Sequence, residues 1–446
     1  SKTLVELLPA TFWACVTTAV GFASLMSSEV TPVYSFGLMM MLAALLVLVA
    51  AVVMAPAGLL AVRFDLPPRD AAAEERLFGW LDQILRLINR RPVALAIGFA
   101  VWTAVSAVGL TRLTVEKDFS KNFRESSDIV QSLIFVEDRL GGAGTWEVNF
   151  PAPDRHEVGD EEFLRFLEQV RVLAERLRTE EPRLTKVVAL TDGLDLVPQN
   201  FSLSQRLEML DTLQPEFRGS LYNAEQRRMR IVLRAEERQP SDEKIELMHN
   251  VERIAQEEFQ GAKATGLFVL LAFLIESIVG DQITSFSLAA AGIFLSMVIA
   301  FRSLRIALIS IVPNIFPIVL VIGGMGWANV PVNIGTAMIA SVSMGLTVDS
   351  TIHYLSAYRR ARDRGLAVAD ALRDTQQYVG RALVFAYVAL MIGFSVLAAS
   401  HFIPLVYFGV LVSAAMLGGL VGDLVLLPLL LRYTERDADD NAAGAG

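Results

Sequence analysis

Several apolar segments of this sequence are long enough to cross a membrane, and they limit the folds that the chain can adopt. They span residues 9–26, 33–62, 92–110, 283–301, 306–327, 332–358, 382–400 and 404–431. Each can cross a hydrocarbon core as a helix, for which about 20 residues suffice, and none contains Lys or Arg. The mean hydropathy of +0.47 agrees with a membrane protein. The sequence therefore predicts a polytopic α-helical membrane protein with about eight spans.

The distribution of arginines predicts how these spans are oriented. Arginines gather in the loops 63–91, 302–305 and 359–381 and in the tail after 431, whereas the turns 27–32, 328–331 and 401–403 carry no Lys or Arg. Because positive loops stay on the cytoplasmic side, we expect a multi-pass protein of the cell inner (cytoplasmic) membrane. The large loop 111–282 is then periplasmic or extracellular.

Residues 111–282 read as an α+β domain. Strand patterns occur at 145–150, 185–190, 229–234 and 262–266, with amphipathic helices at 160–179 and 241–259. A polar insert at 199–219 is expected to form a short helix. The order strand, helix, strand, strand, helix, strand is typical of the ferredoxin-like βαββαβ unit, so a ferredoxin-like external porter domain is predicted.

An internal repeat is the strongest architectural signal. Residues 10–59 match residues 382–431 at a constant offset of 372, with identities that include Gly21 and Gly393, Ser28 and Ser400, Pro32 and Pro404, Gly37 and Gly409, and Pro56 and Pro428. Glycine and proline matches in one register are hard to obtain by chance, and parallel repeats are typical of transporters. We expect Gly21 and Gly393 to make equivalent helix contacts in the two halves.

The repeat defines a set of expected domains. Residues 1–62 would be the last two transmembrane helices of a first repeat, and 63–91 a cytoplasmic linker. The second repeat would comprise a helix at 92–110, the external domain 111–282 and a five-helix bundle at 283–432, before a disordered cytoplasmic tail at 433–446. The chain is thus expected to be a C-terminal fragment of a protein with about twelve membrane helices.

A carboxyl inside the segment 332–358 is the leading candidate for a functional site. Asp349 lies about ten residues before Arg359, which at ~1.5 Å per residue places it near the middle of a ~30 Å core. Gly345 and His353 lie one turn to either side and share its helix face; Gly345 would let another helix approach closely. Acids within a membrane usually mark ion or proton paths, although a role in helix packing is the alternative.

A second acid, Asp423, lies at similar depth in the last segment. It could be a second relay carboxyl or a hydrogen-bonding group between helices, and both roles stay open. The hydroxyls of Thr17, Thr18, Tyr387 and Ser395 could likewise serve a relay or pack helices.

Other chemistries have little support in the sequence. There is no GxxxxGK phosphate loop and no GxSxG elbow, and Cys15 is the only cysteine. The four histidines lack metal-ligand spacing. A net charge of −9 argues against nucleic acid as a partner. We expect no enzymatic activity, no cofactor and no metal site.

The whole pattern resembles the RND (resistance–nodulation–division) superfamily, in its MMPL/Patched-like exporter branch. The matching motifs are Arg302-Ser303-Leu304-Arg305, Val312-Pro313-Asn314, Gly345 to Asp349, Ile352-His353, Gly365, Gly393-Phe394, Gly409, Leu427-Pro428 and Leu140-Gly141-Gly142. The resemblance covers nearly the whole chain. It implies that Gly345 and Asp349 form the proton-relay motif of the second repeat, with Ser350 where a Tyr or a second acid often follows. The first-repeat counterpart of Asp349 would precede Ser1.

The resemblance implies an exporter of hydrophobic or lipid-like molecules, driven by the proton-motive force. Its relay residues would be Asp349, His353, Gly345, Ser350 and Asp423. Expected partners are the lipid or hydrophobic cargo, protons and membrane lipids, and homo-oligomerisation is open. The alternative is a non-transporting lipid- or sterol-sensing-type receptor or regulator on the same fold. An accessory that couples the proton gradient to protein secretion is a third option.

Overall fold

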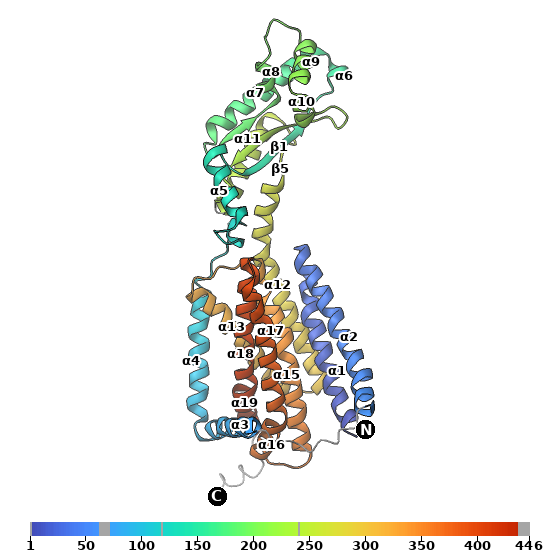
Figure 1. Cartoon of the computed structure of the whole chain (residues 1–446), viewed down its shortest axis with the longest axis vertical. Coiled ribbons are helices and arrows are strands. Elements are labelled where there is room, and N and C mark those ends of the chain that lie inside the picture. Colours follow the sequence, from blue (N-terminus) through green and yellow to red (C-terminus); the bar gives the residue numbers. More distant parts are fainter. Residues whose placement is uncertain (1, 62–71, 117–118, 240, 436–446) are drawn as a thin grey trace. The chain divides into compact units, whose positions relative to one another are not determined.

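The computed structural model describes residues 2–61, 72–116, 119–239 and 241–435 (Figure 1). The chain divides into two compact units. The first, here the membrane unit, comprises Ser1–Val115 and Ile278–Gly446, and the second, the α+β unit, comprises Glu116–Ser277. Most of the predicted tail 433–446 and the first part of the predicted linker 63–91 lie outside the described residues.

The α+β unit is built on one antiparallel sheet. Its strands are β1 (Gly144–Pro151), β2 (Lys186–Val188), β4 (Arg228–Ala235) and β5 (Lys263–Thr265), in the order β2-β4-β1-β5. The short β3 (Tyr222–Asn223) also pairs with β4. β1 pairs with β4 in a register that places Val148 opposite Ile231. The strands lie where apolar and polar residues alternate, because alternation buries one face of a sheet.

Helices of the α+β unit separate the strands as the sequence predicts. α7 (Asp160–Glu180) follows β1, and α11 (Ser241–Glu258) follows β4. A short helix, α8 (Leu190–Asp195), follows β2. The insert 199–219 forms α9 (Leu203–Leu213) and most of α10 (Phe217–Leu221), so it contains more than the single short helix that was expected. The remaining helices are η2 (Phe119–Asn122), α5 (Asp128–Leu140) and α6 (Arg155–Val158).

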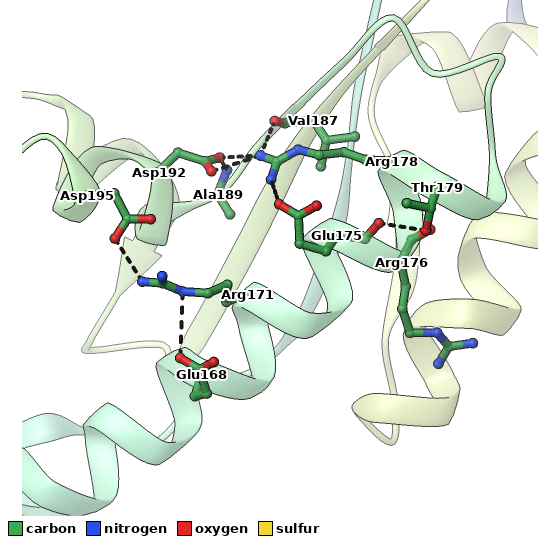
Figure 2. Close-up of polar contacts among 10 residues, drawn as sticks. All are labelled: Glu168, Arg171, Glu175, Arg176, Arg178, Thr179, Val187, Ala189, Asp192 and Asp195. Carbon is green, nitrogen blue, oxygen red and sulfur yellow. Dashed lines mark hydrogen bonds and ion pairs between the residues drawn. The ribbon is translucent and has the colours of Figure 1, made fainter.

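Two arginines of α7 tie this helix to its neighbours. Arg178 bonds both carboxylate oxygens of Asp192 at 2.8 Å and the carbonyl of Val187 at 2.9 Å, which joins α7 to β2 and α8 (Figure 2). Arg176 pairs with Glu257 and Glu258 of α11. The hydrogen bond from Arg176 holds the pKa of Glu257 below its usual value, so this contact favours folding at neutral pH and weakens in acid, as the pH falls through the lowered pKa.

The membrane unit consists of long helices. They are α1 (Lys2–Ala23), α2 (Thr31–Ala61), α3 (Ala72–Arg90), α4 (Pro92–Leu110), α12 (Leu267–Phe301, which begins in the α+β unit), α13 (Leu304–Trp327), α14 (Ile334–Ala337), α15 (Ile339–Asp363), α16 (Val368–Thr375), α17 (Arg381–Ser395), α18 (Ile403–Val421) and α19 (Leu427–Thr434). α16 continues into the π-helical turn η3 (Gln376–Gly380), and α18 into the π-helical turn η5 (Gly422–Leu426).

Seven of the described helices are long and apolar enough to cross a membrane. They match seven of the eight predicted segments. The eighth predicted segment, 332–358, forms the helices α14 and α15. By composition, α15 is less apolar than the seven helices that could span a membrane. Its polar side chains lie inside the bundle, among them Ser341, Ser343 and Thr351, each 0% exposed. A helix that is surrounded by other helices does not need an apolar surface.

The repeat predicted from the sequence recurs as local geometry. Helix α1 ends in the 3-10 turn η1 (Ser24–Ser27), and α17 ends in η4 (Val396–Ala399), 372 residues later. The rings of Phe22 and Phe36 lie 6.1 Å apart at 79°, and those of Phe394 and Phe408 lie 6.0 Å apart at 76°. The hairpins α1–α2 and α17–α18 therefore fold in the same way.

One expected equivalence is wrong. A Cβ on Gly21 would come within 3.0 Å of the Cα of Gly345, so α1 and α15 cross closely there. A Cβ on Gly393 would meet nothing within 4 Å among the described residues. The difference arises because α1 packs this face against α15, whereas the same face of α17 meets no described helix.

Candidate functional site: a buried carboxylate cluster

Helix α15 carries the predicted site through the interior of the membrane unit. It packs against α1, α13 and α18. Before it, Asn333 caps the short α14 by accepting a hydrogen bond from the backbone N–H of Thr336 at 3.0 Å. Small side chains let neighbouring helices come close, as elsewhere in membrane bundles. Because other helices surround it closely, α15 carries polar groups on several buried faces.

Asp349 meets helix α1 at the close crossing of Gly21 and Gly345. The hydroxyl of Thr18 donates to Oδ1 of Asp349 and lies 3.0 Å from the carbonyl oxygen of Gly345, which also accepts. Gly345 is buried at this crossing, which agrees with the close approach that the sequence predicts there. Thr18 is thus the residue of a second helix that positions the Asp349 carboxyl.

A cavity opens beside Asp349. It has a volume of about 1020 Å³ and is bounded by α15, α16, η3 and α17, with Thr11 of α1. Asp349, Ser350 and His353 all line it, and Arg360 and Arg364 line its other end. No hydrogen bond joins Asp349 to His353 in the part of the chain that the structure describes. The three predicted relay residues therefore share a cavity wall without forming a direct chain.

Asp423 belongs to a separate, fully buried cluster. It lies in the turn η5 and exposes 2% of its surface. Thr351 of α15 donates to Oδ1 and Tyr387 of α17 donates to Oδ2, each at 2.7 Å. Ser350 lines the cavity beside Asp349, and Thr351, the next residue of α15, bonds Asp423. Adjacent residues of α15 therefore lie at the cavity and at the buried carboxyl.

Four residues of this region were not singled out for the site from the sequence: Asn314, Thr351, Tyr354 and Gln376. Asn314 of α13 donates to the hydroxyl of Thr351 at 3.0 Å. Gln376, in the turn η3, accepts from Tyr354 at 2.9 Å and donates to the carbonyl of Leu424 at 3.2 Å. The only signal in the sequence is a polar residue in or beside an apolar stretch, and that signal does not identify its partner.

The predicted hydroxyls are now assigned to partners. Thr18 reaches Asp349 and Tyr387 reaches Asp423, whereas Thr17 bonds the carbonyls of Trp13 and Ala14 in its own helix. Ser395 is exposed and bonds the carbonyl of Ile392. In the described ranges, no group of three or more His, Cys, Asp or Glu side chains comes together in a way that could hold a metal ion.

Two acids, Asp349 and Asp423, lie inside a multi-pass helical bundle, an arrangement that is common in membrane transporters. The chain belongs to the MMPL family. The sequence model of this family matches residues 168–441, which is more than half of the chain. It is also similar to a membrane protein of Methanocaldococcus jannaschii, with 22% identity over 370 residues that cover 80% of this chain and 94% of the relative. The chain is therefore an RND/MMPL-type, multi-pass membrane protein.

Proposed function

We propose that this protein exports hydrophobic or lipid-like molecules across the cytoplasmic membrane, driven by the proton-motive force. The proton relay would consist of Asp349, His353, Gly345, Ser350 and Asp423. One charge moved across 100 mV is worth about 2.3 kcal/mol, which is enough for one or two protons to shift an equilibrium between two arrangements of the bundle.

The cavity beside Asp349 is the observation that carries this proposal. It connects a carboxyl within the bundle to the arginine-rich end of α15, near Arg360 and Arg364. A proton relay needs such a route, because an acid sealed in hydrocarbon cannot exchange protons with water. His353 lines the same wall, and an imidazole commonly exchanges protons near neutral pH.

The relay residues have different roles in this proposal. Asp349 carries the proton, and Gly345 brings α1 close enough for Thr18 to bond the carboxyl. His353 modulates exchange along the cavity. Ser350, which lines the cavity, and Tyr387, which bonds Asp423, would pass a proton between the cavity and Asp423.

The domain assignments belong to the same proposal. The α+β unit would be a ferredoxin-like porter domain in the periplasm, which the strand order β2-β4-β1-β5 and the helices α7 and α11 support. Helices α1 and α2 would close a first repeat, and helices from α4 onward, with the porter domain, would form a second. Cargo would leave through the porter domain, alone or in a homo-oligomer.

Replacement of Asp349 tests the mechanism directly. Asp349→Asn keeps the size and the acceptor oxygen for Thr18 but cannot take up a proton. In proteoliposomes with a proton-sensitive dye and a panel of lipids, we expect folded protein with no gradient-driven lipid movement. Ser395→Ala, which removes a hydroxyl bonded only to its own helix, is the matched control and should transport normally.

The competing receptor function predicts another outcome. A lipid-sensing protein on this fold would bind lipid without moving protons. If Asp349→Asn moves lipid at the wild-type rate under an imposed gradient, the relay is wrong. If neither protein moves protons but both bind lipid, the sensing function is favoured.

A further inference from the structure

Asp423 is a buried carboxyl with no cationic side chain beside it. Its interactions with the described residues are hydrogen bonds from neutral hydroxyls, those of Thr351 and Tyr387. Two hydroxyl donors suit an ionised carboxylate, which accepts through both oxygens. A buried negative charge with neutral neighbours is costly until something neutralises it. This site therefore requires a proton or a bound cation.

Oxygen atoms without donors gather next to this carboxyl. Asn314 is 1% exposed; its amide nitrogen donates to Ser310 and Thr351, but its Oδ1 is buried and has no partner among the described residues. The carbonyl of Pro313 lacks the usual helical donor, because Pro317 four residues later has no N–H. This carbonyl oxygen lies 2.8 Å from the position that a Cβ on Gly422 would occupy.

A nearby carbonyl shows that such freed oxygens are otherwise satisfied. Pro428 deprives Leu424 of its helical donor in the same way, and the side chain of Gln376 donates to that carbonyl at 3.2 Å. The carbonyl oxygen of Pro313 instead lies against Gly422, the residue before Asp423, and the amide of Asn314 contacts Thr351, which bonds Asp423. A π-helical turn inside a helix often marks a functional site.

We propose that Asp423, Thr351, Asn314 and the carbonyl of Pro313 form a binding site for a monovalent alkali cation, Na⁺. Hard cations prefer oxygen ligands, and broken membrane helices commonly coordinate Na⁺ through carbonyls freed from helical hydrogen bonds. A single positive charge balances a single carboxylate. A divalent ion would leave a net charge in the interior of the bundle, where charge is costly.

Each ligand comes from a defined element, so the site also joins helices. Asn314 and Pro313 belong to α13, Thr351 to α15 and Asp423 to η5. Gly422 lets η5 pack closely against the Pro313 carbonyl, because a Cβ there would lie only 2.8 Å from the carbonyl oxygen. A bound ion would hold these three elements together, so its binding should raise the stability of the folded chain.

This inference gives Asp423 a cation in place of the proton that the proposed relay assigns to it, and it does not depend on proton transfer at Asp349. Asp349 lines the open cavity and bonds Thr18, whereas the oxygen cluster is built around Asp423. A transport assay tests the relay, and a binding measurement tests the cation site. Either can fail while the other holds.

Thermal unfolding of the purified chain tests the site. In detergent at pH 8, NaCl is titrated against N-methylglucamine chloride at constant ionic strength, and ²²Na⁺ binding is measured in parallel. We expect a saturable rise in Tm with Na⁺ and saturable ²²Na⁺ uptake. Asp423→Asn should abolish both, while the control Asp349→Asn should keep both.

Substitutions at Thr351 keep the test decisive if Asp423→Asn does not fold. Thr351→Val removes a ligand oxygen and should raise the apparent Kd about tenfold or more, the effect of losing a contact worth roughly 1.4 kcal/mol. Thr351→Ser restores the hydroxyl and should restore binding. Stabilisation that is equal in both salts, that does not saturate, that keeps the wild-type Kd in Thr351→Val, or that survives Asp423→Asn overturns the proposal.

Discussion

Thr17 and Thr18 are neighbours on α1 with different bonding. Thr18 bonds Asp349 and the carbonyl of Gly345 on α15, whereas Thr17 bonds only its own helix at 2.9 Å. Thr18→Val keeps the shape and removes the hydroxyl. We expect it to lower the free energy of unfolding by about 1.5–3 kcal/mol, the usual value of a hydrogen bond to a charged group. Thermal unfolding of the purified chain measures the change.

Thr17→Val is the control, because Thr17 is also fully buried and loses only a bond within its own helix. Its loss should be about 1 kcal/mol or less. Equal effects at Thr17 and Thr18 would show that the bond to Asp349 adds nothing to stability, and that Asp349 is not held by α1.

The site was partly predictable at the level of residues. A helical period places Gly345, Asp349 and His353 on one face, and Asp349 and His353 do line one cavity. Their partners could not be derived, because the contact of Thr18 with Asp349 joins residues far apart in the chain. The choice between Thr17 and Thr18 depends on how α1 is rotated about its axis, which an apolar segment does not reveal.

At the level of elements, the two repeated hairpins make a shared prediction. A Cβ on Gly37 would come within 2.7 Å of Leu25 and 2.8 Å of the carbonyl of Phe22, and a Cβ on Gly409 would meet Leu397 and Phe394 at 2.7 and 2.5 Å. Both obstacles include backbone, which cannot swing away. Gly37→Ala and Gly409→Ala should each destabilise by about 1–3 kcal/mol, measured as losses in Tm.

Gly393→Ala is the control in the same repeat. No described atom lies within 4 Å of its added Cβ, so a helical alanine should be neutral or stabilise by up to about 1 kcal/mol. A large loss at Gly393, or none at Gly37 and Gly409, would contradict the contacts of the hairpins.

The elements were predictable where local pattern determines them. The β1 and β4 strands alternate in burial, and α7 buries Phe163, Phe166 and Val170 at helical spacing, so periodicity located all three. The π-helical turns η3 and η5 have no such signal, because one extra residue in a turn leaves the apolar pattern almost unchanged. The length of the segment 332–358 predicted the helix α15. Its polar side chains are tolerated because they lie inside the bundle.

At the level of the whole membrane unit, the two hairpins meet through equivalent residues. The rings of Phe36 and Phe408, which are 372 residues apart, lie 6.4 Å from each other at 85°. A contact between equivalent positions is what a two-fold axis produces in a symmetric dimer. The repeat therefore organises the unit about a local pseudo-symmetry, and Asp349 and Asp423 both belong to its second copy.

The orientation of the chain in the membrane is the last prediction. The arginine-rich loops predict that the α+β unit lies outside the cytoplasm. Leu213, 65% exposed on α9, and Tyr378, 72% exposed in η3, would then lie on opposite sides of the membrane. The only native cysteine, Cys15, is buried, so an engineered cysteine will dominate labelling. In intact cells with a permeabilised outer barrier, an impermeant thiol reagent should label Leu213→Cys at once and Tyr378→Cys only after lysis. Labelling in the reverse order would invert the topology and place the cavity beside Asp349 on the outer side of the membrane.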